Sequence, residues 1–475
     1  MNASGRAVRI PPAIIVPVGP PACGKSTLAA KLVRAGLPAS AVMSLDTVRG
    51  ELCSAPCRCP NAAPGCAGGE TCQCVSRQAF LTVARRADIA AKQGRPVYVD
   101  GTNLVARVRR DSIKRAHAQG MPAVALLAKV VSLADLYAAN TSRDRVVPTF
   151  VIDKMHAQHA IITAAALYAE GFDLVVEWDH NTTFAYLPYG PDATTVSGPF
   201  FFIGDVHGNW EALNELLTQA GFDVELNHPD GLLPVLLGDV VNKGGMELSD
   251  DPDHPDLVGS VQVLRWALRM WRQGKLVWIR GNNERKLARK LALRETTGDE
   301  GVAATLAALY AQPDADVFVS DLIRFLPRLP VHLILADAGE RFIAVHGGIR
   351  PDLVGRTDRK AENFCLYVRS GWVEIWNGPE TVVYGHVIQS NGPRYHRVVP
   401  ADASAIRPGA TWGIDTGCYA GGGLTGLHSR TGLVHVPSSP SDRGAYVRHL
   451  ASAMERTPSE GRFAKIAAPS ELALV

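Results

Sequence analysis

Hydrophobic runs alternate with helix-like stretches along the first 178 residues of the chain. Short apolar runs predict strands at 13–18, 95–100 and 123–131. Residues 26–36 follow a glycine-rich loop and predict a helix. Strands that alternate with helices favour a parallel sheet with flanking helices. We therefore expect an α/β domain over residues 1–178.

The pattern changes at residue 179. Residues 179–198 are polar and contain two prolines and two glycines, a composition typical of a linker. From 199 to 438, short apolar runs end repeatedly at a glycine beside Asp, Asn or His, which predicts a second strand-rich domain. The tail, 439–475, contains one expected helix at 446–456.

Composition and charge narrow the class of protein. The 475 residues are 47% hydrophobic and 20% charged, which is typical of a globular protein with more than one domain. Residues 1–185 carry 21 Lys and Arg against 13 Asp and Glu. This excess suggests a polyanionic partner, and solvated surface charge explains it equally well. No segment reaches membrane-spanning length or resembles a secretion signal, so we expect a cytoplasmic protein without a membrane partner.

The loop GPPACGKST, residues 19–27, fits the pattern G-x-x-x-x-G-K-[ST] between a predicted strand and a predicted helix. In such loops, backbone N–H groups surround phosphate oxygens at the positive end of the helix. Lys25 adds charge at the β and γ phosphates, and Ser26 can hold Mg²⁺. The pattern predicts ATP binding with Mg²⁺ through Gly19, Gly24, Lys25, Ser26 and Thr27.

Charged residues near this loop are candidates for phosphoryl transfer. Asp46 follows a short strand, where a carboxylate can accept the proton of an attacking hydroxyl. Arg49, one turn later, can hold an anionic acceptor. Arg143 and Arg145 can close as a lid and neutralise developing charge. Taken singly, each of these is explained as well by a helix cap or surface charge.

Six of the nine cysteines lie within residues 53–74, in a segment rich in glycine and proline. Four thiolates bind Zn²⁺ tetrahedrally and can fold a segment that lacks an apolar core. We favour zinc, and disulfides or free redox-sensitive thiols are the alternatives. The insert follows Asp46 and Arg49, so we expect it to shape the acceptor entrance. The candidate ligands are Cys53, Cys57, Cys59, Cys66, Cys72 and Cys74.

Five motifs in the second half each follow an apolar run and therefore lie at strand ends. They read GDVHGN (204–209), GDVVNKGG (238–245), RGNNE (280–284), VHGGIRPDL (345–353) and VVYGHV (382–387). Their oxygen and nitrogen ligands suit two divalent ions such as Mn²⁺, Fe or Zn²⁺. Two such ions activate a bridging water and hold a phosphate. The candidate ligands are Asp205, His207, Asp239, Asn282, His346 and His386.

The motifs GPPACGKST, SLDTVR, VDGTN and SRDRVVP together resemble the kinase domain of bacterial polynucleotide kinase-phosphatases. The second series, with GIDTGCYAGGGLTGL (413–427), resembles the phosphoprotein-phosphatase-like branch of binuclear metallophosphoesterases, which includes the phosphatase domain of the same enzymes. The resemblance implies a P-loop NTPase fold followed by a calcineurin-like α/β sandwich. It also implies ATP-dependent phosphorylation of 5′-hydroxyl ends and removal of 3′ or 2′,3′-cyclic phosphate from RNA or DNA.

The resemblance also implies a role for individual residues. Asp46 is then the general base, Arg49 holds the neighbouring nucleic-acid phosphate, and Lys25, Arg143 and Arg145 stabilise the transferred phosphoryl group. Asp205 and His207 bind one metal, Asp239 bridges, and Asn282, His346 and His386 bind the other, with Mn²⁺ as the expected ion. The family's C-terminal ligase is not recognisable, so sealing would need a separate ligase.

Three positions depart from the family pattern, GDxVDRG and GNH[DE]. Asn283 replaces the histidine that protonates the leaving oxygen, and Asn242 replaces the aspartate that holds this histidine. Lys243 replaces a phosphate-binding arginine and loses its bidentate fork. An asparagine cannot act as a general acid near neutral pH, so we expect slow cleavage of alkyl phosphates.

Two other functions fit the sequence. The chain could join a small-molecule kinase to a nucleotide or phosphoprotein phosphatase, or it could join a kinase to an inactive module that only binds phosphate ends. Retained metal ligands argue against the inactive module, whereas Asn242 and Asn283 argue for it. The choice between RNA and DNA, the identity of the metals and the oligomeric state do not follow from the sequence.

Overall fold

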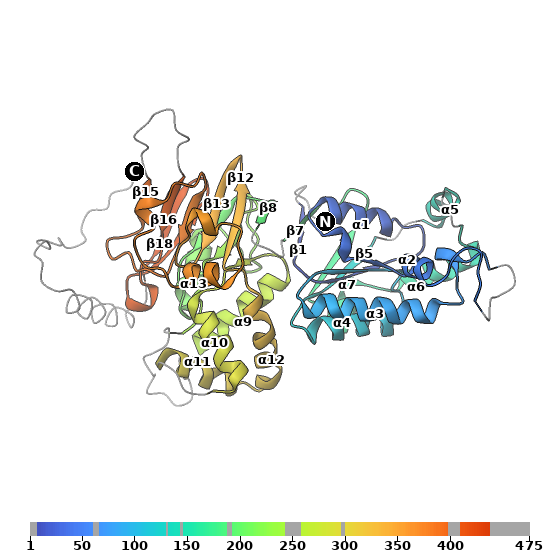
Figure 1. Cartoon of the computed structure of the whole chain (residues 1–475), viewed down its shortest axis with the longest axis horizontal. Coiled ribbons are helices and arrows are strands. Elements are labelled where there is room, and N and C mark those ends of the chain that lie inside the picture. Colours follow the sequence, from blue (N-terminus) through green and yellow to red (C-terminus); the bar gives the residue numbers. More distant parts are fainter. Residues whose placement is uncertain are drawn as a thin grey trace, which may run out of the picture.

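The structure, a computed structural model, describes residues 7–59, 66–129, 132–142, 146–187, 192–242, 258–295, 300–397 and 409–437. Two domains lie side by side, the first coloured blue to cyan and the second green to red (Figure 1). The candidate residues Arg143, Arg145 and Lys243 and the tail 439–475 lie outside the described residues.

A five-stranded parallel sheet with the order β3-β4-β2-β5-β6 forms the centre of the first domain. Successive strand residues point to opposite faces, so Val16 packs into the core on one face and Ile15 into the core on the other. The predicted parallel α/β sheet is confirmed. Its strands are β2 (Ile14–Val18), β3 (Val42–Ser44), β4 (Val97–Asp100), β5 (Ala123–Ala128) and β6 (Leu174–Trp178).

Seven helices are described in the first domain. The long helices α3 and α4 run beside each other under the sheet in Figure 1, and α1 lies on the other side. They are α1 (Lys25–Arg34), α2 (Leu45–Leu52), α3 (Ser76–Lys92), α4 (Ala106–His117), α5 (Leu133–Thr141), α6 (Thr149–Ala160) and α7 (Ala164–Glu170).

Two stacked sheets form the second domain. The rings of Phe202 and Phe342 meet between the sheets, with centroids 5.6 Å apart. One sheet has the order β11-β10-β9-β17-β18, with strands β9 (Phe200–Ile203), β10 (Leu233–Leu236), β11 (Val277–Trp278), β17 (Leu424–His428) and β18 (Gly432–Val436). The other has the order β15-β16-β14-β13-β12-β8, with strands β8 (Asp192–Ser197), β12 (His332–Asp337), β13 (Glu340–Val345), β14 (Thr381–Tyr384), β15 (Arg394–Arg397) and β16 (Ala410–Gly413).

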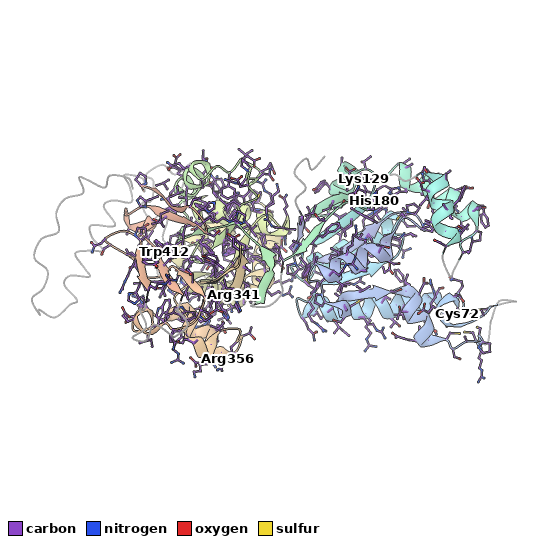
Figure 2. All side chains as sticks on the ribbon, turned by 90° about the horizontal axis from the view of Figure 1, so that it is seen from above. Cys72, Lys129, His180, Arg341, Arg356 and Trp412 are labelled. Atoms are coloured by element: carbon purple, nitrogen blue, oxygen red, sulfur yellow. The ribbon has the colours of Figure 1, made fainter. Side chains whose placement is uncertain are left out.

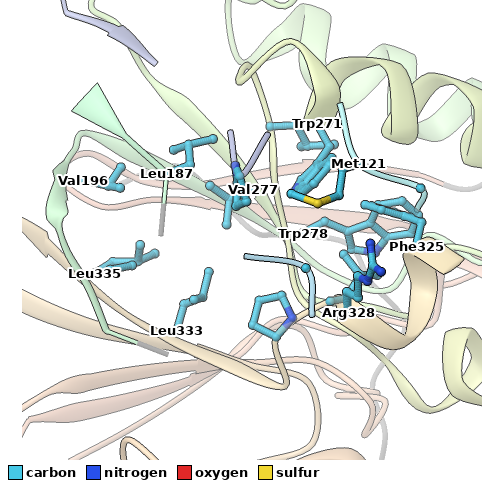
Figure 3. A pocket seen from close by; sticks show the side chains of 17 residues that line it. Met121, Leu187, Val196, Trp271, Val277, Trp278, Phe325, Arg328, Leu333 and Leu335 are labelled. Carbon is cyan, nitrogen blue, oxygen red and sulfur yellow. The ribbon is translucent and has the colours of Figure 1, made fainter. Parts of the chain in front are cut away.

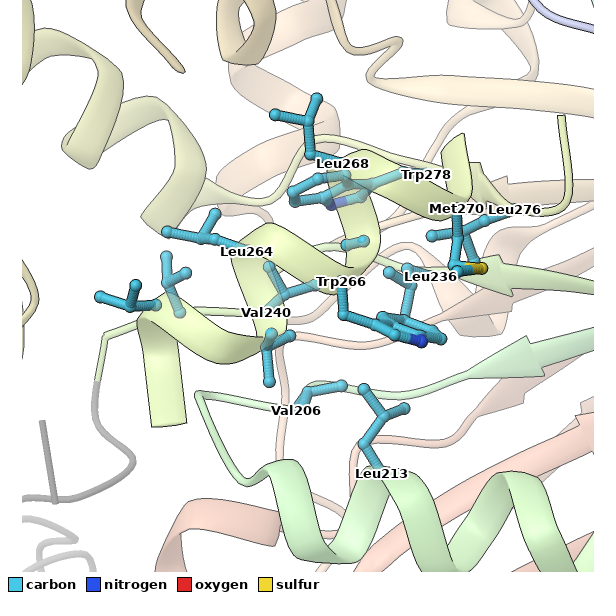
Figure 4. Close-up of a cluster of buried hydrophobic side chains, with 14 of the residues drawn as sticks. Val206, Leu213, Leu236, Val240, Leu264, Trp266, Leu268, Met270, Leu276 and Trp278 are labelled. Atoms are coloured by element: carbon cyan, nitrogen blue, oxygen red, sulfur yellow. The ribbon is translucent and has the colours of Figure 1, made fainter. Parts of the chain in front are cut away.

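Helices cover the outer faces of both sheets. Leu264 and Met270 belong to a cluster of buried apolar side chains that also contains Leu213 and Leu236 (Figure 4). Helix α13 (Arg359–Tyr367) packs on the other sheet. The remaining described helices of this domain are α8 (Trp210–Gln219), α9 (Val258–Arg272), α10 (Asn282–Leu293), α11 (Glu300–Tyr310) and α12 (Ala315–Phe325).

The segment 179–198, expected to be a linker, carries two strands. Strand β7 (Phe184–Tyr186) pairs in parallel with β1 (Val8–Ile10), and β8 pairs with β12 of the second domain. Tyr186 and Val196 are buried, so apolar residues between the prolines and glycines anchor the segment to both domains.

Hydrogen bonds from Arg328 connect the two domains. Its guanidinium donates to the carbonyl oxygens of Ala91 and Lys92, both at 3.3 Å, and to that of Gln119. These carbonyls lie at the ends of α3 and α4, where helices leave acceptors unsatisfied. Further polar links join Arg9 to the Gly231 oxygen at 3.0 Å and Arg272 to Asp173 at 3.6 Å.

An apolar cavity of about 60 Å³ lies beside Arg328 at the junction. Figure 3 shows Met121 of the first domain beside Trp271, Trp278 and Phe325 of the second. Small-molecule sites usually occupy about 300–1,000 Å³, so we interpret this space as a packing gap between the domains.

None of the described helices is both long enough and apolar enough to cross a membrane.

We predict that Arg328→Ala lowers the midpoint of urea unfolding by the equivalent of about 1–2 kcal/mol, because the helix-end carbonyls lose their donor. The control is Arg356→Ala, which removes a side chain that is 44% exposed and pairs only with surface carboxylates in the described part of the chain. Equal midpoints for the two variants would contradict a connecting role for Arg328.

Candidate active sites

The glycine-rich loop joins β2 to α1 at the carboxyl edge of the first sheet. Gly24 caps α1 with a φ of 94°, and Lys25 is the first residue of the helix. The Lys25 ammonium lies within the loop and donates to the carbonyl oxygens of Gly19 at 3.1 Å and Pro20 at 2.5 Å. A cation and a helix N-terminus therefore meet in one loop, and both attract phosphate.

A cleft of about 730 Å³ opens beside this loop, within the range of small-ligand sites. The ends of three neighbouring parallel strands, β2, β3 and β4, contribute to its walls. The loop between α5 and α6 and the first turns of α6 contribute further lining residues. The cleft brings together Lys25, Ser26, Thr27, Asp46, Arg49 and Asp100.

Asp46 and Arg49 form an ion pair on the cleft wall. Ser44 caps α2 and accepts the Asp46 backbone N–H at 3.2 Å, which places the carboxylate in the first turn. The Arg49 Nε atom donates to Ser76 Oγ of α3 at 3.1 Å. The Arg49 side chain is 13% exposed and the Asp46 side chain 45% exposed, so a solvated carboxylate stands beside a partly buried cation.

Part of the positive charge of the first domain is neutralised. Arg109 is 4% exposed and donates to Glu170 at 2.8 Å, while Arg115 pairs with Asp88. These arginines stabilise the domain, and the excess of basic residues must come from other side chains, since Glu170 and Asp88 are already among the 13 acidic residues.

The apolar part of the far side of the cleft was not predicted from sequence. Ser142 and Val147 line the cleft on either side of the segment that contains Arg143 and Arg145. Val151 and Met155 of α6 add an apolar wall. Val151 and Met155 lie beyond the motif SRDRVVP (142–148), and their place in the cleft depends on how α5 and α6 pack over the sheet edge.

The second candidate site lies where five strands of the second domain end. Each predicted ligand follows β9, β10, β11, β13 or β14, and all of these strands have a parallel neighbour. Carboxyl ends of parallel strands meet at one edge of a sheet, where α/β folds bind ligands. The two sheets thereby bring motifs about 180 residues apart to one place.

The ligand atoms form two groups that share Asp239. Within each group the atoms lie within 4.8 Å of one another, and Asn282 Oδ1 lies 2.9 Å from His346 Nε2. This is the grouping that the family resemblance implied. One group is Asp205, His207 and Asp239, and the other is Asp239, His346 and His386.

Hydrogen bonds fix how two of the histidines face the site. His346 Nδ1 lies 2.9 Å from the Leu237 carbonyl oxygen, and His207 Nδ1 lies 3.0 Å from that of Asn242. A carbonyl accepts only from a protonated Nδ1, so each Nε2 keeps a lone pair directed toward the carboxylates. Histidines that bind metals are oriented in this way, so the donor set fits two divalent cations.

Three of the candidate ligands have a strained backbone. His207, Asp239 and His386 have φ values of 51°, 49° and 66°, a region that residues other than glycine rarely adopt. Such conformations persist where surrounding contacts impose them, and they are common at functional sites.

Glu284 joins two of the ligand loops and was missed in the sequence, although it ends the GNNE motif. Its buried carboxylate accepts backbone N–H groups of Asp239 and Val240, both at 2.8 Å, and of Gly281 at 2.7 Å. A Cβ at Gly281 would lie 2.3 Å from the Asp239 nitrogen, so only glycine allows this approach. Burial and the Asp239 carboxylate raise the pKa of Glu284 to about 8, and nearby divalent cations would oppose this rise.

Asn283 directs its side chain at the shared carboxylate. Its Nδ2 donates to Asp239 Oδ2 at 2.6 Å, and its backbone N–H donates to Oδ1 at 2.8 Å. Asn242 is adjacent, with Nδ2 3.4 Å from the Asn283 carbonyl oxygen and Oδ1 buried without a hydrogen-bond partner among the described residues. The two substituted positions are therefore neighbours, and the side chain of Asn283 orients Asp239.

Other residues of the motifs support the site. Asn209 caps α8, and Arg280 binds Glu362 at 3.0 Å, while burial lowers the pKa of Arg280. The Tyr419 ring meets the edge of His207 with centroids 4.8 Å apart. Tyr419 lies in the segment 413–427. In the sequence, only the resemblance of this segment to the family pattern pointed to Tyr419.

Known families match both domains. Residues 14–161 match the model described as AAA domain, and residues 198–407 match calcineurin-like phosphoesterase. The bis(5'-nucleosyl)-tetraphosphatase PrpE of Halalkalibacterium halodurans is 27% identical over 258 residues, which cover 50% of this chain and 94% of that protein. The PrpE of Geobacillus thermodenitrificans is 30% identical over 257 residues, with 50% and 93% covered.

One solved structure that matches is a cold-active protein-tyrosine phosphatase of a psychrophilic Shewanella. It is 16% identical, covers 53% of this chain and 82% of its own, and has a TM-score of 0.32, too low to add to the assignment.

We predict that Glu284→Gln weakens divalent-metal binding to the second domain by about 10–100-fold, because an amide cannot accept all three N–H groups. Calorimetric titration of the metal-free protein with MnCl₂ measures this change. Glu295→Gln, at an exposed position just beyond the same helix, is the control and leaves the affinity unchanged. Unchanged affinity in Glu284→Gln would refute the orienting role.

Proposed function

Because the chain belongs to the calcineurin-like phosphoesterase family through its C-terminal half and carries a P-loop, kinase-like AAA domain before it, we propose that it heals nucleic-acid ends. In this proposal the first domain phosphorylates a 5′-hydroxyl end from ATP and Mg²⁺. The second removes a 3′ or 2′,3′-cyclic phosphate. The observation that supports it best is the Asp46–Arg49 pair, which faces the same cleft as Lys25.

The residues of the first cleft divide the work of phosphoryl transfer. Lys25 and the loop N–H groups hold the triphosphate, and Ser26 holds its Mg²⁺. Asp46 takes the proton of the attacking 5′-hydroxyl. Arg49 binds the first phosphate of the acceptor strand, which distinguishes an oligonucleotide from a free nucleoside.

We predict that Asp46→Asn slows phosphate transfer from labelled ATP to a 5′-hydroxyl oligonucleotide by about 10²–10⁴-fold, because the general base is lost. ATP affinity stays near the wild-type value. Asp88→Asn, an exposed carboxylate on α3, is the control. Assays on RNA and DNA acceptors identify the preferred strand. Efficient labelling of a nucleoside or sugar, with none of the oligonucleotide, would instead indicate a metabolite kinase.

The residues of the second site hold divalent metals, of which Mn²⁺ is the expected ion, and position a phosphate ester. The metals supply charge neutralisation and an activated water when bound. Asp239 is common to both groups of ligands; Asn283 donates to its carboxylate, and Glu284 accepts its backbone N–H. The site contributes an amide where related enzymes contribute an acid, so the leaving oxygen departs without a proton from Asn283.

A second candidate for this domain is hydrolysis of a phosphoanhydride in a dinucleoside polyphosphate. Two observations favour it. The relatives from Halalkalibacterium and Geobacillus are named bis(5'-nucleosyl)-tetraphosphatases. Cleavage of a phosphoanhydride also releases a weakly basic phosphate, and this leaving group needs a general acid far less than an alkoxide does. A site with Asn283 in place of the acid therefore suits such a substrate.

Asn283→His separates the two candidates when hydrolysis is measured with Mn²⁺ on three substrates. We predict that the histidine accelerates hydrolysis of a 3′-phosphorylated oligonucleotide by about 10²-fold or more, and that it accelerates hydrolysis of nitrophenyl phosphate much less. Fast wild-type hydrolysis of diadenosine tetraphosphate, unchanged in the variant, supports the second candidate. Asn214→His, exposed on α8, is the control. Equal acceleration of the ester substrates would contradict the role assigned to position 283.

A further inference from the structure

The six cysteines of the insert converge on one another. Cys53 and Cys72 are buried with Val75, and Cys57, Cys59 and Cys66 pack against them. Cys72 lies at the end of the first domain that is remote from the second domain (Figure 2). The apolar part of this cluster is too small to fold the insert by itself.

The sulfur atoms form two overlapping sets of four. Each set of four has its sulfurs within 4.8 Å of one another, and both sets contain Cys57 and Cys72. The first set is Cys53, Cys57, Cys59 and Cys72, and the second is Cys57, Cys66, Cys72 and Cys74.

The separations between sulfurs are those of metal-bound thiolates. Six pairs lie 3.6–4.0 Å apart, beginning with Cys57 and Cys72 at 3.6 Å. Four sulfurs about 2.3 Å from a central Zn²⁺ lie about 3.8 Å from one another. A disulfide would require about 2.05 Å, so these contacts fit tetrahedral metal coordination and do not fit disulfides.

We propose that the insert binds two Zn²⁺ ions in a six-thiolate cluster, in which Cys57 and Cys72 bridge both ions. Cys53 and Cys59 complete one tetrahedron, and Cys66 and Cys74 complete the other. A single ion would leave two of the six thiols without a role, although all of them lie in the same cluster. Two ions use every thiol and give each metal four ligands.

The backbone of the insert is built around these contacts. A Cβ at Gly68, whose φ is 82°, would lie 2.4 Å from the Ser54 carbonyl oxygen and 2.6 Å from the Cys57 nitrogen. Glycine therefore allows the two arms of the insert to cross closely between the first and last cysteines.

The cluster also connects the two helices that hold Arg49. Cys53 follows α2 directly, and Cys72 and Cys74 precede α3. Ser76, in the first turn of α3, accepts the Arg49 Nε N–H at 3.1 Å. The two metals would thus fix the start of α3 relative to the end of α2 and orient Arg49 toward the cleft. The cluster thus positions Arg49, and the role of Arg49 in binding the acceptor strand rests on the proposed function.

The metal count is tested on the full-length, zinc-loaded protein. A mercurial thiol reagent displaces thiolate-bound zinc, and a colorimetric dye measures the zinc released; the second domain has oxygen and nitrogen ligands and keeps its metals. We expect two zinc ions released as six thiols react. Release of one ion, or none, would overturn the proposal. This measurement uses the wild-type chain and does not depend on the folding of any variant.

Variants test which thiols bridge. Cys57→Ser removes a ligand from both ions, and Cys74→Ser removes a ligand from one. After loading with Co²⁺, we expect the thiolate-to-cobalt absorption to fall further in Cys57→Ser than in Cys74→Ser. Cys365→Ala, a buried cysteine outside the insert, is the control and keeps the wild-type spectrum. Equal losses in the two insert variants would contradict the bridging assignment.

Kinase assays test the effect on Arg49. Removal of the cluster zinc is expected to raise KM for the oligonucleotide by about tenfold or more, with KM for ATP unchanged. If the protein releases two zinc ions but phosphorylates no oligonucleotide, the two-zinc cluster is supported and only the proposed function is contradicted. Unchanged oligonucleotide KM after zinc loss would refute the positioning role of the cluster.

Discussion

Three backbone N–H groups from two loops donate to the buried carboxylate of Glu284, and the order of the metal-binding edge depends on this contact. One loop follows β10 and presents Asp239, and the other follows β11 and presents Asn282. Unsatisfied buried N–H groups cost about 1–3 kcal/mol each, so loss of the carboxylate would release both loops. The left-handed conformation of Asp239 persists because these contacts impose it.

The same geometric rule organises both candidate sites. Functional groups stand at the carboxyl ends of neighbouring parallel strands, in the cleft after β2, β3 and β4 and at the edge after β9, β10 and β13. Most of these strands are buried and apolar, and β3 is half-buried, so packing determines their positions. Chemistry can then vary in the loops while the sheets stay constant. The exchange of a general acid for Asn283 is a variation of this kind.

The departures from the family pattern have different structural meanings. Asn283 and Asn242 lie within an otherwise intact set of ligands, and Asn283 donates to the shared Asp239 carboxylate. In the proposed function they alter the proton supplied to a leaving group, and the six proposed metal ligands remain. The cysteine insert adds a separately stabilised element next to Arg49 and leaves the cleft residues unchanged. In the proposed function, one departure therefore concerns the chemical step, and the other concerns recognition of the acceptor.

The sequence by itself determined the local features of this protein. Short-range patterns of glycine, charge and apolar runs predict the loop at 19–27, the strand ends that carry Asp205 and Asp239, and the parallel α/β class. A strand end and a helix start each depend on a few adjacent residues, so a motif there can be read without the fold.

Only the tertiary structure decided which distant groups meet. Arg109 is neutralised by Glu170, 61 residues away, and Glu284 reaches Asp239, 45 residues away. The expected linker became two strands because their partners, β1 and β12, lie elsewhere in the chain. Cysteine spacing did not decide which thiols share a metal, because the distances between sulfurs depend on how the turns of the insert fold the chain back on itself. These contacts arise when whole elements pack, and no local pattern records that packing.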